Sequence, residues 1–213
     1  MESRTTKIYS KASCKVALKI IKGHFATNHS HINYYVDMAT LKARQSEASA
    51  AAKILAKYYE NTTYVDTIIC MDGCEVIGAY LAQALTDSGI MSMNQHETIY
   101  VVSPEDHPGG QLIFRDNMQF MVKGKHILML FANATTGKTI QRALDCVQYY
   151  EGNVVGIAAV FSAVSKVRDI DVHSIFTAAD IPDYRTYDVS KCPHCQAKEK
   201  VDAMVNSYGY SKI

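Results

Sequence analysis

The 213-residue sequence lacks an apolar run of membrane-spanning length, an excess of one charge, internal repeats and low-complexity tracts. The missing apolar run argues against a membrane partner. A formal net charge of +1 gives no sign of a nucleic-acid partner. The opening Met-Glu-Ser-Arg-Thr-Thr-Lys is not a signal peptide, and six unevenly spaced cysteines are typical of reduced thiols. We therefore expect a cytoplasmic protein.

The hydrophobic content of 48% is sufficient for one folded domain over residues 1–213. Apolar spacing predicts alternating strands and helices. The predicted strands cover 65–70, 99–102, 127–131, 154–160 and 173–177, and the predicted helices cover 14–21, 46–59, 76–85 and 138–150. This alternation predicts an α/β fold whose central, mainly parallel sheet is flanked by helices and binds ligands at the carboxyl ends of its strands.

The segment from His126 to Ile140 reads as a buried strand, a turn of small residues and the start of a helix. A helix N-terminus presents free amides and a positive dipole end, both of which favour a phosphate. The predicted phosphate-binding residues are Thr135, Thr136, Gly137, Lys138 and Thr139. The alternative is that these residues only cap the helix and bind no phosphate, because threonine is a common capping residue.

Gly137-Lys138-Thr139 also matches the end of a nucleoside-triphosphate P-loop, which is a second alternative. Ala132 occupies the place of that motif's first glycine. The next apolar strand ends in Ser162-Ala163, without the carboxylate that would hold magnesium. The P-loop interpretation is therefore the less favoured one.

Four segments, which lie at residues 23–37, 65–78, 135–137 and 181–195, together resemble type I phosphoribosyltransferases, and orotate phosphoribosyltransferases most of all. Residues 135–137 match the Thr-Thr-Gly of the 5-phosphate loop, and residues 23–37 resemble the N-terminal signature. Residues 65–78 resemble the pyrophosphate-loop strand and turn, and residues 181–195 resemble a tail that ends in Cys-Pro-x-Cys.

This resemblance implies a type I phosphoribosyltransferase fold with a small N-terminal hood. The expected parts are the hood at 1–40, the core at 60–180 and the tail at 181–213. The resemblance also implies a homodimer, because the family builds its site across two subunits. An active member would join orotate to phosphoribosyl pyrophosphate, with Mg²⁺, and release orotidine 5-phosphate and pyrophosphate.

The positions that face the ribose in this family depart from its pattern. Phe131 and Ala132 occupy the places of two acidic residues, and Asn133 follows them. Transfer builds positive charge at the ribose, so acidic neighbours and hydrogen bonds to the hydroxyls support it. Hydrogen bonds to charged groups are worth about 1.5–3 kcal/mol each, so their loss predicts weak transfer.

The two regions that handle the diphosphate depart from the pattern as well. In the flexible loop, over residues 102–109, His107 matches the family histidine and is the candidate catalytic residue, but Glu105 and Asp106 replace basic residues. The residues that correspond to the pyrophosphate loop are Asp72, Gly73, Cys74 and Glu75. A carboxylate at Glu75 discourages a diphosphate unless Mg²⁺ lies between them.

Two functional hypotheses follow. The first is a protein that binds a phosphoribosyl group or nucleotide monophosphate at residues 135–139, with weak or lost transferase activity. The second is an active orotate phosphoribosyltransferase of pyrimidine biosynthesis that uses Mg²⁺ and phosphoribosyl pyrophosphate. We predict no resident metal: Cys192 and Cys195 resemble half of a zinc site, but there is no second Cys-x-x-Cys pair, and His194 between them is badly placed.

Overall fold

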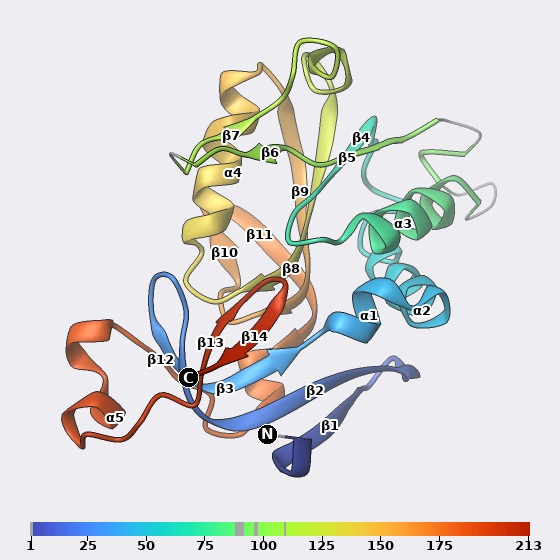
Figure 1. Ribbon diagram of the computed structural model, residues 1–213. Helices are drawn as coiled ribbons and strands as arrows, with labels where there is room; N and C mark the ends of the chain where they lie inside the picture. The colour runs from blue at the N-terminus through green and yellow to red at the C-terminus, as the bar shows by residue number, and fades with distance from the viewer. Residues whose placement is uncertain (1, 88–91, 96–97, 109) are drawn as a thin grey trace.

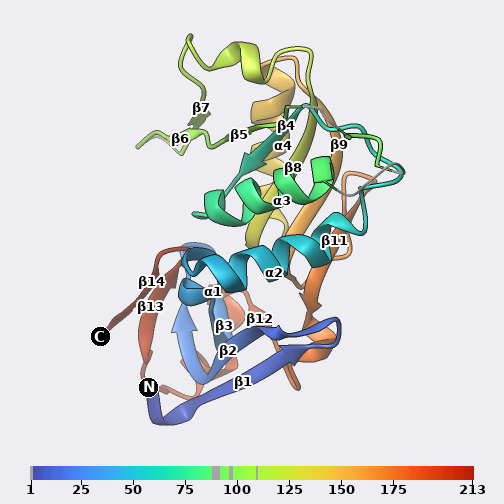
Figure 2. The same cartoon turned by 90° about the vertical axis from the view of Figure 1, so that its right-hand side faces the viewer.

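Two six-stranded β-sheets, with helices packed against them and a separate two-stranded hairpin, make up the described part of the chain (Figure 1). The computed structural model describes residues 2–87, 92–95, 98–108 and 110–213. The larger part is a strand–helix core, and the smaller part is a hood, to which both ends of the chain contribute (Figure 2). Among the described residues, no helix is both long and apolar enough to cross a membrane.

The central sheet has the strand order β10-β11-β9-β8-β4-β5. Its strands are β4 (Thr67–Cys70), β5 (Tyr100–Val102), β8 (His126–Ala134), β9 (Asn153–Ser162), β10 (Lys166–Val167) and β11 (Ile170–Thr177). All neighbouring pairs are parallel except β10 with β11. The predicted α/β fold with a mainly parallel sheet is therefore confirmed.

Helices cover both faces of this sheet. Those before β5 are α1 (Ala39–Ala43), α2 (Gln45–Ala56) and α3 (Glu75–Asp87), and α4 (Lys138–Tyr149) links β8 to β9. Strand β8 shows how the faces divide: Leu128 and Leu130 belong to the apolar cluster that includes α2 and α3, whereas Ile127 and Met129 belong to the cluster that includes α4. Alternate side chains of a strand point to opposite faces, so a continuous apolar run fits a strand covered on both sides.

The hood is a second sheet, of order β12-β3-β2-β13-β14, with β1 paired to β2. Its strands are β1 (Thr5–Ser10), β2 (Ser13–Ala26), β3 (His31–Asp37), β12 (Thr186–Tyr187), β13 (Ala203–Asn206) and β14 (Gly209–Lys212). Strand β13 runs parallel to β2 and places the tail of the chain in the hood. The hood is therefore built from residues that are far apart in the sequence.

The predicted helix over 14–21 is wrong, because these residues lie in the long strand β2. Val16, Leu18 and Ile20 are buried and alternate with more exposed residues, which is the two-residue period of a strand. Val16 and Ile20 are β-branched and fit a pleated sheet better than a helix. The other predicted helices and strands are present, with ends shifted by a few residues.

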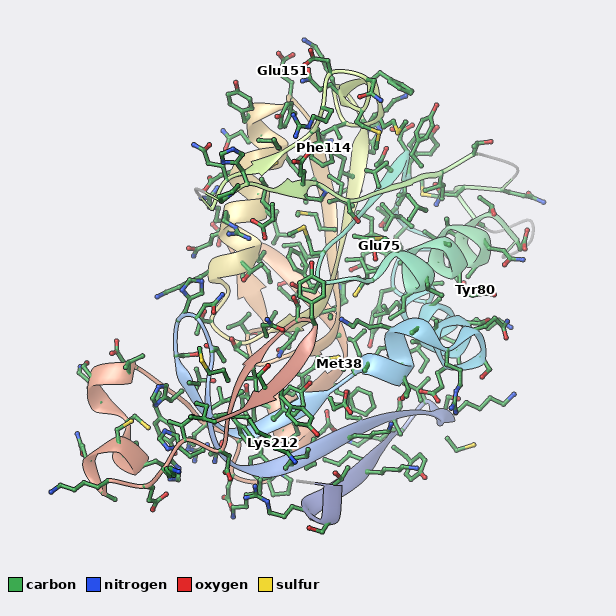
Figure 3. All side chains as sticks on the ribbon, viewed as in Figure 1. Met38, Glu75, Tyr80, Phe114, Glu151 and Lys212 are labelled. Carbon is green, nitrogen blue, oxygen red and sulfur yellow. The ribbon has the colours of Figure 1, made fainter. Side chains whose placement is uncertain are left out.

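The remaining elements are short. Strands β6 (Glu105–Asp106) and β7 (Leu112–Ile113) form a separate hairpin, and α5 (Pro193–Gln196) is a single helical turn in the tail. The 3₁₀ turns cover Glu2–Arg4, Gln119–Met121, Ala178–Asp180 and Val189–Lys191. Figure 3 shows Met38, which follows β3, at the junction between hood and core.

Candidate functional site

A cavity of about 440 Å³ lies where the hood meets the carboxyl ends of β4 and β8. The core contributes residues that follow both strands, and the hood contributes the turn between β2 and β3 and the turn between β13 and β14. Ligands of open parallel α/β sheets bind at this edge. The cavity is therefore the candidate site.

The predicted phosphate loop forms one wall of the cavity. Thr135, Lys138 and Thr139 line it, whereas Thr136 and Gly137 shape the turn behind them. Gly137, the N-cap residue of α4, has φ 74° and no side chain with which to cap this helix N-terminus. The first amides of α4 are consequently left for another acceptor.

The three predicted ribose-facing positions have different surroundings. The Phe131 side chain is fully buried in the apolar cluster under α4, so it does not face the cavity. Ala132 and Asn133 do line the cavity. The Asn133 Oδ1 atom is buried and has no hydrogen-bond partner among the described residues. A buried acceptor without a donor is costly, so this oxygen is suited to a ligand hydroxyl.

Three cationic side chains, Lys42, Lys138 and Arg142, line the same cavity. Lys42 Nζ donates to the backbone oxygens of Asp72 and Ser207, each at 2.6 Å, and so ties the core to the hood. Sequence reasoning missed Lys42 and Arg142. A signal for Arg142 was present, because it lies four residues after Lys138 and therefore on the same helix face.

The residues of the predicted pyrophosphate turn divide between cavity and core. Asp72 lines the cavity with φ 61°, a left-handed conformation that aspartate tolerates better than most residues. Burial raises the pKa of its carboxyl, although Lys42 acts in the opposite direction. Gly73 completes the turn, also with positive φ.

Cys74 and Glu75 do not line the cavity. The Cys74 side chain is fully buried, and burial raises the pKa of its thiol, so it is not an accessible nucleophile. Glu75 opens α3 (Figure 3) and accepts a hydrogen bond from Ser103 Oγ at 2.7 Å. Its charge is favourably placed at that helix N-terminus and is directed to the loop rather than to the cavity.

The predicted flexible loop is a β-hairpin whose acidic residues are paired with arginines. Both Glu105 carboxylate oxygens accept from Arg115, at 2.6 and 2.7 Å. Asp106 lines the cavity and lies 3.5 Å from Arg142. The expected repulsion of a diphosphate is therefore reduced, because each carboxylate faces a guanidinium group.

His107, the candidate catalytic residue, lies in this hairpin. Its backbone amide donates to the Gln111 oxygen at 2.8 Å, and its side chain is not part of the cavity wall. Gly109, also in the predicted loop stretch, lies outside the described residues.

The hood side of the cavity is more apolar. Ile32, Tyr35, Val36 and Met38 line it, beside the exposed His29 of the β2–β3 turn. The rings of Tyr35 and Tyr210 meet edge to face, with their centroids 5.5 Å apart. Burial raises the pKa of the Tyr35 hydroxyl to about 12. A neutral aromatic wall of this kind suits a planar base better than a second phosphate.

No family model matches the sequence, and no curated protein matches it either. Solved structures do match, and they assign the type I phosphoribosyltransferase fold, as predicted. Orotate phosphoribosyltransferase of Mycobacterium tuberculosis H37Rv is 16% identical, with TM-score 0.52, over 78% of this chain and 93% of that one.

Two further similar structures extend the comparison. UMP synthase of Leishmania donovani is 14% identical, with TM-score 0.55, over 75% of this chain and 34% of that one. Adenine phosphoribosyltransferase of Thermoanaerobacter pseudethanolicus is 15% identical, with TM-score 0.50, over 83% of this chain and 96% of that one. At such identities, the similarity establishes the fold of this chain and leaves its substrate to be argued from the site.

Proposed function

We propose that this protein binds a sugar monophosphate, as a phosphoribosyl group or a nucleotide, in the cavity between hood and core. The observation that carries the proposal is the uncapped N-terminus of α4, which opens on the same cavity as the unpartnered oxygen of Asn133. The amides, with Lys138, would hold the phosphate, and Asn133 would accept from a ribose hydroxyl.

Transferase activity is proposed to be weak or lost. The two positions before Asn133 carry no acceptor side chain, since one is alanine and the other is the buried Phe131. The developing positive charge of the ribose would then meet an amide oxygen rather than carboxylates. The candidate catalytic residue His107 is also absent from the cavity wall.

An active orotate phosphoribosyltransferase is the second candidate, and the three cations favour it. Lys42, Lys138 and Arg142 provide the positive charge that a diphosphate requires. The Mycobacterium tuberculosis enzyme has been crystallised with phosphoribosyl pyrophosphate. Mg²⁺ would enter with that diphosphate, because it binds through substrate phosphates and one or two carboxylates, and Asp72 and Asp106 line the cavity. A cytoplasmic homodimer acting in pyrimidine biosynthesis belongs to this candidate.

Calorimetric titration and a pyrophosphate-release assay distinguish the candidates. We expect ribose 5-phosphate and orotidine 5-phosphate to bind without Mg²⁺, and little pyrophosphate to appear when orotate and phosphoribosyl pyrophosphate are supplied with Mg²⁺. Turnover at about 1 s⁻¹ or faster, the range of ordinary enzymes, would favour the transferase. Absence of binding by both monophosphates would reject the proposal, and a sedimentation measurement would test the homodimer.

A further inference from the structure

A cluster of two histidines and two cysteines lies in the hood, apart from the candidate cavity. His24 and His31 flank the turn between β2 and β3, and Cys192 and Cys195 flank the start of α5. One ligand atom from each residue lies within 4.8 Å of every other. The two pairs are separated by more than 150 positions in sequence, so the fold itself creates the cluster.

We propose that His24, His31, Cys192 and Cys195 bind one Zn²⁺ ion. Two thiolates and two imidazoles form a common ligand set of structural zinc sites. The four residues come from the protein alone and complete a tetrahedron, so no position remains open for a substrate. The site is therefore structural rather than catalytic.

The distances fit a tetrahedral ion. His24 Nε2 lies 3.6 Å from Cys192 Sγ and 3.7 Å from Cys195 Sγ, and Cys195 Sγ lies 3.2 Å from His31 Nδ1. With Zn–N of about 2.0 Å and Zn–S of about 2.3 Å, tetrahedral geometry places nitrogen and sulfur about 3.5 Å apart. The two imidazole nitrogens are 2.9 Å apart and need to separate by only a few tenths of an ångström.

Neighbouring groups fix the tautomer and the direction of the His24 ring. His24 Nδ1 lies 3.2 Å from the backbone oxygen of Glu199, and since a carbonyl only accepts, Nδ1 carries the proton. The lone pair of Nε2 then points to the cluster, as in many metal-bound histidines. His194, between the two cysteines, is not part of the cluster, and its Nδ1 pairs with Glu199 Oε2 at 2.5 Å.

Burial and chemistry indicate a metal rather than free thiols. His24, His31 and Cys192 are buried, and only Cys195 of the four is exposed. Zinc would bind both cysteines as thiolates and release their two protons to solvent, with no change of oxidation state. The ion would join the β2–β3 turn to the 192–195 segment of the tail; residues 27–29 of that turn and residues 205–209 further along the tail line the candidate cavity.

Metal content of the full chain tests the site directly. Protein purified without chelators should carry about one zinc ion per chain, as measured by elemental mass spectrometry. Cys192→Ala and His31→Gln should lose the ion, whereas Cys14→Ala, an exposed thiol of β2, and His194→Gln should retain it. Zinc retained in Cys192→Ala at the wild-type level would overturn the proposal.

Reconstitution of the wild-type chain keeps the test decisive if a variant fails to fold. After removal of the metal by a chelator, Co²⁺ should produce the intense visible bands of a tetrahedral ion and the charge-transfer bands of thiolate ligands. Absence of these bands, or a disulfide between Cys192 and Cys195 in the purified protein, would contradict the site. Neither measurement involves a sugar phosphate, so a failure here is distinct from a failure of the proposed function.

Discussion

Replacing Gly137 by alanine perturbs the turn on which the proposed phosphate site depends. Gly137 has φ 74°, and an added Cβ would lie 3.2 Å from Val167 Cγ2. A left-handed conformation costs a residue with Cβ about 1–2 kcal/mol. We expect the variant to relieve this cost by rotating the turn, which would move the first amides of α4 away from the phosphate.

The loss in affinity follows from the number of amides displaced. A hydrogen bond to a charged group is worth about 1.5–3 kcal/mol, so displacing one amide should weaken binding about tenfold or more. Calorimetry with ribose 5-phosphate measures this loss, and urea unfolding measures the loss of stability.

Gly124→Ala is the matched control. Gly124 has φ 69° and lies before β8, at the strand end opposite to the phosphate loop, and its added Cβ would meet nothing within 4 Å. The control should lose similar stability and keep full affinity. Equal affinity of Gly137→Ala and wild type, with the expected loss of stability, would mean that this turn does not bind the phosphate.

Three other sites give further predictions. Asn133→Ala should weaken ribose 5-phosphate about threefold to tenfold by calorimetry and leave inorganic phosphate unchanged, since the amide oxygen is proposed to serve the ribose; equal losses would contradict this. Arg142→Ala should weaken phosphoribosyl pyrophosphate more than ribose 5-phosphate at low salt, and the reverse order would contradict its role beside the diphosphate. Burial raises the pKa of Asp66, but hydrogen bonds from His126 at 2.8 and 2.9 Å outweigh burial and lower it overall. A lowered carboxyl pKa stabilises the fold above its unfolded value of about 4, and this contribution is lost as the pH falls through the folded pKa. Asp66→Asn should therefore reduce stability at pH 7 by about 1 kcal/mol and flatten its decline in acid, as urea unfolding would show; an unchanged pH profile would contradict this.

Local patterns predicted the core well. The apolar runs of β8 and β9 and the spacing of α2 and α4 identify these elements without tertiary information. In the predicted phosphate loop, Thr135, Lys138 and Thr139 line the cavity as neighbours in sequence, and their binding of a phosphate stays a prediction. Short-range periodicity is most reliable where packing on both sides of an element agrees with it.

The hood was harder to predict because its order depends on distant segments. Strand β2 pairs with β3, β1 and the tail strand β13, and this pairing overrides a weak helical pattern over 14–21. The same pairing brings the two histidines beside the two cysteines of the tail. Sequence spacing identifies a Cys-x-x-Cys pair but does not identify distant histidine partners.

A crystal structure of the protein with ribose 5-phosphate would show where the phosphate and the ribose bind. We predict that the phosphate accepts from the backbone amides at the start of α4, next to Lys138, with a ribose hydroxyl at hydrogen-bond distance from Asn133 Oδ1. A ligand whose phosphate lies elsewhere, with the turn at 135–139 empty, would contradict the account.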